Sequence, residues 1–431
     1  MAAIRRQFPA LRQRVGGVRP VYFDNPGGTQ VPARVIDAMR RYLIEANCNT
    51  HGLFHTSHLT DQTLQAARVA IADLLNAPSP DEIVFGANMT TLTLAISRAI
   101  GRTLAAGDEI VVTRMDHDAN IAPWLLAARD HGLSVKWANF DPETGRLDLD
   151  HMAGLITERT AVVACVYASN ALGTINDVAR VVEMAHSVGA LAYIDAVHYA
   201  PHGPIDVQAL GCDFLVCSAY KFFGPHVGIL YGRRDHLARL PVYKVRPAPE
   251  QVPDRWETGT LNHEGIAGVT AAVEYLAWIG EQFGGLFQKQ SKGYKGRRRT
   301  LKQAMHAICH YEQTLSHALI EGLSSIKGVE IRGITDLGRL DERVPTVIFN
   351  IQGKTPQDVA WALGKAGIYV WDGNYYALSV MEVLGREEHG GMVRVGAVHY
   401  NTRREVDRFL AEVERIASRQ ARTATRKAQA G

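Results

Sequence analysis

Two charged residues that follow apolar segments are the clearest chemical signal in this sequence. Asp195 follows the apolar run Leu191–Ile194, and Lys221 lies 26 residues later, after a second run at Phe214–Cys217. Pyridoxal phosphate needs an amine that forms an internal Schiff base and an anion beside its pyridine nitrogen. Lys221 and Asp195 fit these two roles. A lysine with the ordinary pKa of about 10.4 is a poor nucleophile, so Lys221 must lie in a dry site or beside positive charge.

Each of the two residues also has an ordinary structural explanation. Asp195 alone would cap a helix, and Lys221 alone would be an exposed lysine at the end of a strand, since charged residues are mostly exposed. Phe222 and Phe223 supply an apolar wall behind the lysine. The combination therefore favours a cofactor site over two unrelated surface charges.

Short apolar runs alternate with amphipathic stretches between Ile36 and Tyr231, as in a parallel sheet covered by helices. The pattern predicts an α/β fold with a doubly wound lobe at residues 17–262, whose ligand lies at the carboxyl ends of the strands. The predicted strands are Glu109–Thr113, Ala161–Val166, Leu191–Ile194 and Phe214–Cys217, with a helix at Val178–Ser187.

After His263 the pattern changes and indicates a smaller α+β lobe at residues 263–417, joined by the N-terminal residues 1–16. Residues 418–431 are polar, basic and rich in small residues, which predicts a disordered tail. The predicted helices are Ala267–Ile279, Gln290–Gly322, Pro356–Ala366 and Arg404–Ala417, and the predicted strands are Val329–Ile331, Thr346–Ile351 and Met392–Val398.

From about Val21 to about Phe409 the chain resembles the class V aminotransferases, which are fold-type I pyridoxal-phosphate enzymes, and within them the cysteine-desulfurase-like branch. The resemblance implies that His117 stacks on the cofactor ring and relays protons. It also implies that Asn170 lies beside the cofactor and that His198 bonds the ring hydroxyl. The implied phosphate contacts are Met89, Thr90, Ser218 and Tyr220, with His263 reaching across a dimer to the partner's phosphate.

Residues Leu92–Ala99, directly after the phosphate-binding turn, are predicted to form a helix. The N-terminus of a helix favours an anion through its free N–H groups and its dipole. The resemblance further implies that Arg394 takes the substrate carboxylate, because a guanidinium fork grips a carboxylate through two parallel hydrogen bonds. Asn49, His51 and Tyr376 are implied to face the substrate side chain and to select it.

One segment departs from the desulfurase pattern. Desulfurases carry a mobile-loop cysteine in a segment that reads roughly Arg-x-Gly-x-x-Cys, whereas Trp371 and Tyr376 stand here at the arginine and cysteine positions. A phenol cannot accept sulfane sulfur, so the usual persulfide chemistry is disfavoured. Cys165, Cys212 and Cys217 lie in apolar runs and are most simply small core residues.

The composition excludes several classes of function. A formal net charge of +3 is too small to indicate binding to nucleic acid or attachment to a membrane. The N-terminus lacks the apolar core of a signal peptide, and no apolar run approaches the roughly 18 residues of a membrane span. Five scattered cysteines without paired or metal-ligand spacing indicate a reducing compartment and no metal site. We therefore expect a cytoplasmic protein.

Together these features predict a pyridoxal-phosphate enzyme that acts on an amino acid as a homodimer. After removal of the α-proton by Lys221, expulsion of a β-substituent would make the enzyme a lyase. We favour a lyase that cleaves a carbon–sulfur bond without a persulfide cysteine. An aminotransferase or an epimerase is the alternative. A non-catalytic scaffold is a third hypothesis, against which the joint presence of Lys221, Asp195, His117 and Arg394 argues.

Overall fold

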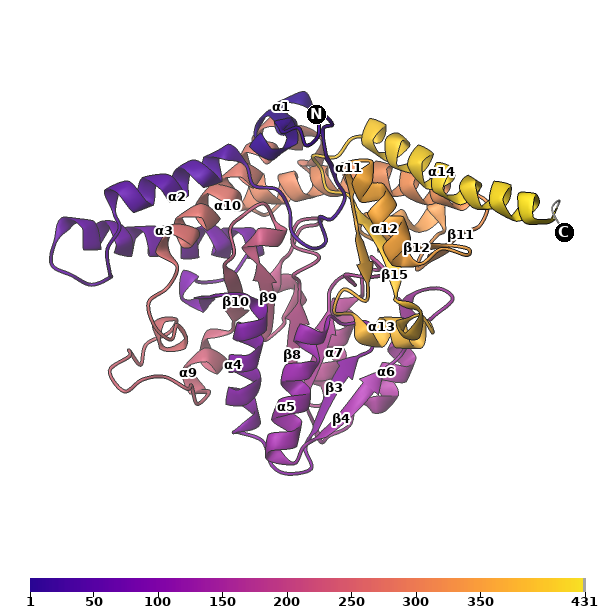
Figure 1. The fold of residues 1–431 in the computed structure, drawn as a ribbon. Helices are drawn as coiled ribbons and strands as arrows, with labels where there is room; N and C mark the ends of the chain where they lie inside the picture. Colours follow the sequence, from indigo (N-terminus) through magenta and orange to yellow (C-terminus); the bar gives the residue numbers. More distant parts are fainter. Residues whose placement is uncertain (429–431) are drawn as a thin grey trace.

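The structure, a computed structural model, describes residues 1–428 and is built on a seven-stranded sheet (Figure 1). The strands lie in the order β2-β10-β9-β8-β7-β3-β4, and only β10 runs antiparallel to its neighbours. This confirms the predicted doubly wound, mainly parallel sheet. The strands are β2 (Ile83–Gly86), β3 (Glu109–Thr113), β4 (Ser134–Ala138), β7 (Thr160–Val166), β8 (Leu191–Asp195), β9 (Phe214–Ser218) and β10 (Gly228–Gly232).

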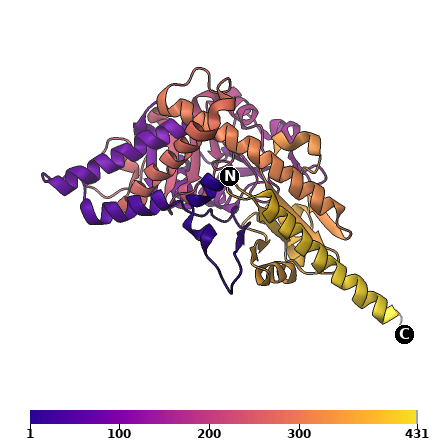
Figure 2. The same ribbon diagram turned by 90° about the horizontal axis from the view of Figure 1, so that it is seen from above.

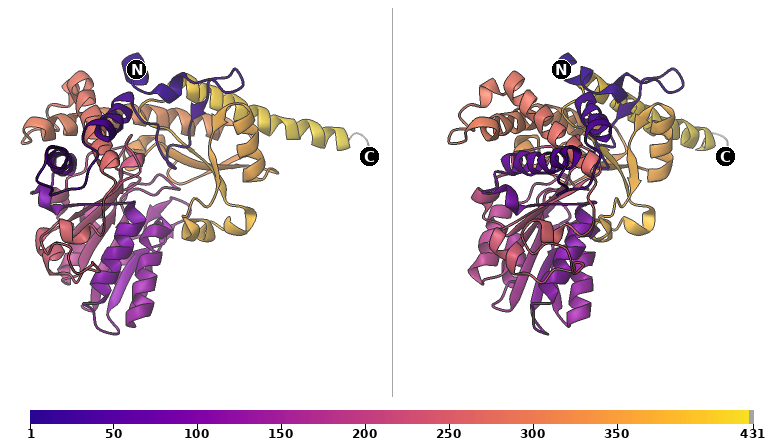
Figure 3. Two further views of the ribbon diagram at one scale, coloured as in Figure 1. Left: turned by 60° about the vertical axis from the view of Figure 1, so that its left-hand side comes forward. Right: turned by 90° about the vertical axis from the view of Figure 1, so that its left-hand side faces the viewer.

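Both faces of this sheet are buried, which explains why its central strands are continuous apolar runs. Side chains alternate between the two faces along a strand. On β7, Val163 and Cys165 pack in one core cluster, whereas Val162 and Ala164 pack in another. Helices cover both faces (Figure 3). One face is covered by α3 (His55–Leu75), α7 (Val178–Ser187) and α10 (His263–Phe283), and the other by α4 (Met89–Gly101) and α5 (Ala122–His131).

A second, four-stranded antiparallel sheet has the order β11-β12-β15-β14. Its core cluster also contains side chains from α12, from the second half of α11 and from α14, which runs along the outside of this sheet (Figure 2). The elements are β11 (Val329–Arg332), β12 (Thr346–Ile351), β14 (Trp371–Gly373), β15 (Met392–Gly396), α11 (Gly296–Ser325), α12 (Pro356–Lys365) and α14 (Arg403–Ala428).

The N-terminal segment contacts both sheets. Phe8 and Leu11 pack in the core of the large sheet, while β1 (Val21–Tyr22) pairs in parallel with β13 (Ile368–Tyr369) beside the small one. The remaining elements are short, apart from α2, and connect these layers: α1 (Ala2–Arg6), α2 (Ala33–Glu45), α6 (Leu149–Leu155), α8 (Val207–Leu210), α9 (Arg234–Arg239), α13 (Leu378–Val383), β5 (Phe140–Asp141) and β6 (Arg146–Leu147). No helix among residues 1–428 is long and apolar enough to cross a membrane.

The structure differs from the predicted boundaries of the smaller lobe and of the tail. Residues 263–283 form α10, whose buried side chains Val269 and Leu276 belong to the core of the large sheet, so the change of core falls within α11 and not at His263. Helix α14 continues to Ala428, where a disordered tail from residue 418 was expected; the segment is rich in Ala, Arg and Lys, which favour helix. Residues 429–431 of that predicted tail lie outside the described residues.

Gly228 on β10 offers a test of the packing between β10 and the start of α4. A Cβ atom at Gly228 would overlap the backbone of Asn88, which caps the N-terminus of α4. We expect Gly228→Ala to destabilise the protein by about 1–3 kcal/mol, as overpacking does, and to lower its melting temperature in a calorimetric scan. Gly154→Ala is the control, because a Cβ there meets open space within α6. Equal melting temperatures for the two variants would contradict this packing.

Candidate active site

The candidate site lies at the carboxyl ends of β8 and β9. These parallel strands are neighbours, and Asp195, the last residue of β8, pairs in register with Val216 of β9. Lys221 is the last residue of the single turn Ala219–Lys221, which follows β9. Adjacent parallel strands end at the same edge of the sheet. The two residues from which the sequence analysis started therefore share one cavity.

That cavity, called the inner cavity below, collects most of the predicted cofactor residues. Ser218 lies beside it, since its Oγ accepts a hydrogen bond of 3.1 Å from the Met89 N–H. The lining residues are Met89, Thr90, His117, Val166, Asn170, Asp195, Val197, His198, Tyr220 and Lys221.

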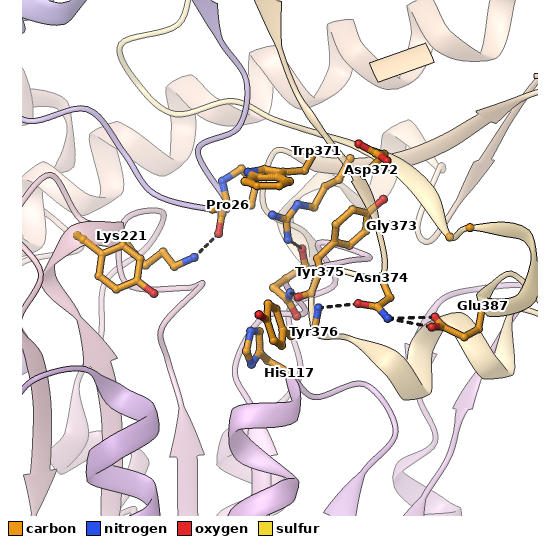
Figure 4. Close-up of a pocket in the computed structure, with 16 residues that line it drawn as sticks. Pro26, His117, Lys221, Trp371, Asp372, Gly373, Asn374, Tyr375, Tyr376 and Glu387 are labelled. Carbon is orange, nitrogen blue, oxygen red and sulfur yellow. Dashed lines mark hydrogen bonds between the residues drawn. The ribbon is translucent and has the colours of Figure 1, made fainter. Parts of the chain in front are cut away.

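A second cavity of about 570 Å³, called the outer cavity, shares His117, Asn170, Tyr220 and Lys221 with the inner one. Figure 4 shows His117 and Lys221 among the side chains that line it. The predicted substrate residues Arg394 and Tyr376 both line it. Its other lining residues are Pro26, Gly27, Trp371, Asp372, Gly373, Asn374, Tyr375, Glu387, Gly390 and Gly391.

Lys221 meets the requirement for a reactive amine. Burial, together with the nearby guanidinium of Arg394, lowers its pKa to about 7, although Asp195 and Asp24 act in the opposite direction. The Nζ atom donates a hydrogen bond to the carbonyl oxygen of Pro26. An amine with this pKa is partly neutral at neutral pH and can act as a nucleophile or a base.

Asp195 is a buried carboxylate in need of a cation. Burial raises its pKa to about 6, although its Oδ1 accepts a hydrogen bond of 2.8 Å from the Val197 N–H. A protonated pyridine nitrogen beside it would favour the charged carboxylate. Asp116, one residue before His117, is also buried, and burial raises its pKa to about 8 despite hydrogen bonds from Thr113 and Asn120.

His117 is a neutral imidazole. Its Nδ1 accepts a hydrogen bond of 3.0 Å from the Ala119 N–H, which assigns the remaining ring proton to Nε2. Burial and the positive charges of Lys221 and Arg394 lower its pKa to about 4. One neighbour of the ring is Tyr376, stacked with centroids 5.5 Å apart.

His198 is held from the smaller sheet. Its Nε2 lies 3.0 Å from the hydroxyl of Thr346 on β12, while burial lowers its pKa. This contact occupies one ring nitrogen, so Nδ1 is the nitrogen that can serve a ligand. The sequence analysis did not identify Thr346, because nothing in the strand pattern of β12 indicates a contact with a residue 148 positions away.

Arg394 on β15 lines the outer cavity. Its Nη1 donates a hydrogen bond of 2.9 Å to the carbonyl oxygen of Asn170, whereas its buried Nε has no hydrogen-bond partner within residues 1–428. Burial lowers its pKa to about 10, so the group stays cationic at neutral pH. A buried arginine that is held through Nη1 and has unused donors beside a cavity suits a carboxylate ligand.

These residues fit pyridoxal phosphate. The N-terminus of α4 and the Ser218 hydroxyl offer donors for a phosphate, Asp195 offers an anion, and Lys221 offers an amine. The buried Oδ1 of Asn170 has no partner among the described side chains, although its Nδ2 donates to the Tyr375 carbonyl at 3.0 Å. Such an orphaned acceptor next to the inner cavity is a further sign of a ligand site.

Three predicted residues do not reach this site within one chain. Asn49, His51 and His263 line a separate cavity of about 790 Å³, where the Nδ1 of His263 lies 3.2 Å from the Cys48 carbonyl oxygen. They belong to the loop between α2 and α3 and to the start of α10, not to the strand ends around Lys221. Within one chain they therefore lie apart from the residues around Lys221.

The sequence analysis also missed two residues beside the reactive amine. Pro26 accepts the Lys221 hydrogen bond, and Asp24 is a carboxyl whose Oδ1 is buried without a partner within the described part of the chain. Burial raises the pKa of Asp24, while Arg394 and Lys221 lower it. The turn signal Asp-Asn-Pro-Gly-Gly from residue 24 was visible in the sequence, but it indicates only a turn.

The low pKa of Lys221 can be tested by labelling. After hydroxylamine treatment to free the amine, we expect trinitrobenzene sulfonate to modify Lys221 with half-maximal rate near pH 7, because the neutral amine is the reactive form. Peptide mass spectrometry measures the rate at each lysine. The exposed Lys327 is the internal control, and an ordinary lysine titrates near pH 10.4. Identical pH profiles at the two positions would contradict the assignment.

Comparison with known proteins identifies the family of the chain. The aminotransferase class-V family matches residues 21–284 and 299–409. A cysteine desulfurase from Yersinia pestis (strain Pestoides F) is 32% identical over 429 residues, covering 96% of this chain and 97% of the relative.

Solved structures give the same result. The apo structure of a cysteine desulfurase from Thermococcus onnurineus NA1 superposes with a TM-score of 0.84 at 27% identity, covering 97% of this chain and 98% of that one. The cysteine desulfurase CsdA from Escherichia coli superposes with a TM-score of 0.80 at 28% identity, covering 96% and 97%. These neighbours confirm the predicted fold-type I architecture.

Proposed function

Since the chain belongs to the aminotransferase class-V family and is a pyridoxal-phosphate-dependent enzyme, we propose that it cleaves a carbon–sulfur bond of an amino acid by β-elimination. The preferred substrate class is an S-substituted cysteine. In this proposal Arg394 binds the α-carboxylate, and Lys221 removes the α-proton. When bound, the cofactor supplies the electron sink that stabilises the resulting carbanion.

The residues around the cavity support these roles by their charges. Lys221 has a pKa of about 7 and can take a proton at neutral pH. Asp195 would pair with the pyridine nitrogen of the bound cofactor and favour its protonated form. His117, whose Nδ1 carries no proton, would cover the bound cofactor and exclude water from it.

The observation that carries the proposal is that no thiol of the same chain lines the site. None of the five cysteines lines the inner or outer cavity, and the segment from Trp371 to Ala377 contains none. A self-persulfidating enzyme needs such a thiolate, whereas β-elimination releases the sulfur with its substituent. In the proposed reaction R–S–CH2–CH(NH2)–COOH and water give R–SH, pyruvate and ammonia, so no acceptor on the protein is required.

Transamination or epimerisation of an amino acid is the second candidate. The same absence of a thiol favours it, because neither reaction involves sulfur transfer. The products separate the candidates, since transamination releases a keto acid that keeps the side chain and epimerisation inverts the α-carbon.

A homodimer is part of the proposal. Asn49, His51 and His263 would complete the site of a second subunit, which explains why they are remote from Lys221 in their own chain. Exposed apolar side chains near the same loop support a covered surface there: Ile36, Leu43, Ile44, Leu53 and Phe54. The five cysteines are all unpaired, which supports the cytoplasm as the compartment.

Product analysis tests the reaction class. The purified protein is scanned for the visible absorbance of its cofactor, with L-cysteine, cysteine sulfinate and S-methyl-L-cysteine added in turn. We expect S-methyl-L-cysteine to yield methanethiol, pyruvate and ammonia in equal amounts, because the leaving group needs no protein thiol. Free cysteine should give little alanine. A shifted spectrum without pyruvate, accompanied by a keto acid or by loss of optical activity, would replace the lyase by the second candidate.

The lysine assignment has a spectroscopic test of its own. We expect Lys221→Ala to lose the visible band of the isolated protein, because that band requires the covalent link between lysine and cofactor. Lys327→Ala, at an exposed position, is the matched control and should keep the band. An unchanged spectrum in Lys221→Ala would refute the assignment, whatever the reaction.

A further inference from the structure

The loop between β14 and α13 contains two successive residues with unusual backbone. Tyr375 and Tyr376 have φ angles of 54° and 59°, in the left-handed region. Residues other than glycine seldom adopt this region, and such positions cluster at ligand clamps and active sites. The conformation sends the two rings to different partners, of which one is His117 and the other is Arg394.

Tyr376 lies at the surface of the outer cavity. It is 73% exposed, and its ring stacks on His117 with an interplanar angle of 20° (Figure 4). Its backbone carbonyl accepts a hydrogen bond of 2.7 Å from the Asp118 N–H. Tyr376 therefore contacts the wall of the site but not the carboxylate-binding group.

Tyr375 lies against the carboxylate-binding group itself. Its ring covers the guanidinium of Arg394 with the Cζ atom 4.3 Å from the ring centroid. Its hydroxyl donates to the Met392 carbonyl on the strand that carries Arg394, and its own carbonyl accepts from Asn170. Asn170 in turn accepts the Nη1 hydrogen bond of Arg394 through its backbone oxygen. Tyr375, Asn170 and Arg394 thus form one closed set of contacts.

The loop is tied down on its other side. The Oδ1 of Asn374 accepts a hydrogen bond of 3.0 Å from the Tyr376 N–H, while its Nδ2 lies 3.0 and 3.2 Å from the two oxygens of the Glu387 carboxylate. Ala377 is buried in an apolar cluster that also contains Met115 and Ile348, one from each sheet region. These contacts hold the loop in place, so the ring of Tyr375 is a fixed surface.

We propose that Tyr375 is a positioning residue that sets the orientation of Arg394 for a substrate carboxylate. The Asn170 bond restrains only one end of the guanidinium, and the ring of Tyr375 against its Cζ atom restrains the rest of the group beside the outer cavity. A cation over an aromatic face in a desolvated site is a substantial attraction. The inference rests on the proposed role of Arg394 in binding the α-carboxylate.

The test uses two unreactive probes and the cofactor-loaded protein. 3-(Methylthio)propionate carries the carboxylate but no amine, so it cannot react, and 3-(methylthio)propanamide is its neutral match. Ligand-observed NMR titration measures their dissociation constants in the millimolar range. The variant is Tyr375→Asn, because asparagine tolerates a left-handed backbone. Tyr376→Asn is the loop-matched comparison, since it has nearly the same φ.

We expect Tyr375→Asn to weaken binding of the carboxylate about tenfold and to leave the amide unchanged. Tyr375→Phe keeps the ring and should bind the carboxylate as the wild type does. Tyr376→Asn should keep the wild-type ratio of carboxylate to amide affinity. In an Arg394→Ala background, Tyr375→Asn should cause no further loss, because its effect acts through the arginine.

Equal weakening of both probes, or no weakening of either, would overturn the inference. The inference would also be overturned if Tyr375→Asn still weakened carboxylate binding in the Arg394→Ala background. The same holds if Tyr375→Phe failed to bind the carboxylate as the wild type does. Since neither probe is turned over, these outcomes do not depend on the lyase reaction. An enzyme that proves to be a transaminase can still confirm Tyr375, and an enzyme that cleaves carbon–sulfur bonds can still refute it.

Discussion

The site depends on two basic side chains, Lys221 and Arg394, that line the same partly buried cavity. Desolvation and the arginine charge together lower the pKa of the lysine to about 7, so the amine can be neutral when it has to react. Arg394 keeps its charge and requires an anion. The carboxylates of Asp195 and Asp24 offset part of this positive charge. A substrate carboxylate and a cofactor phosphate would offset the rest, which makes an anionic ligand part of the electrostatic balance.

The two sheets must be held together for these charges to meet. Lys221 and Asp195 come from the strand ends of the large sheet, while Arg394 comes from β15 of the small one. The contacts of His198 with Thr346 and of Arg394 with Asn170 cross between these layers. Contacts such as that of Thr346 therefore hold the two layers in register around the site.

Much of this could be predicted, for a physical reason. The strands of the large sheet are buried on both faces, so Glu109–Thr113 and Phe214–Cys217 stood out as apolar runs, and β3 and β9 agree with them to within one residue. Residues that follow such strands meet at one edge, which placed Lys221 and Asp195. Contacts such as Tyr375 with Arg394 depend on how a loop folds back, and local sequence carries no signal of that. Asn49, His51 and His263 show a further limit, because a linear pattern does not tell which loops the fold brings to the same cavity.

The anchoring of the loop from Asn374 to Ala377 bears on which reaction the site can carry out. A thiol that receives sulfur must approach the substrate and then leave, so it benefits from a mobile loop. Here the segment is anchored at Glu387, Asn170 and Asp118, and it directs one aromatic ring to Arg394 and one to His117. In the proposed reaction a loop held in this way would orient the substrate carboxylate, whereas it would not carry sulfur away. Its geometry therefore favours reactions in which the leaving group departs by itself, and in which specificity is set by how firmly Arg394 is held.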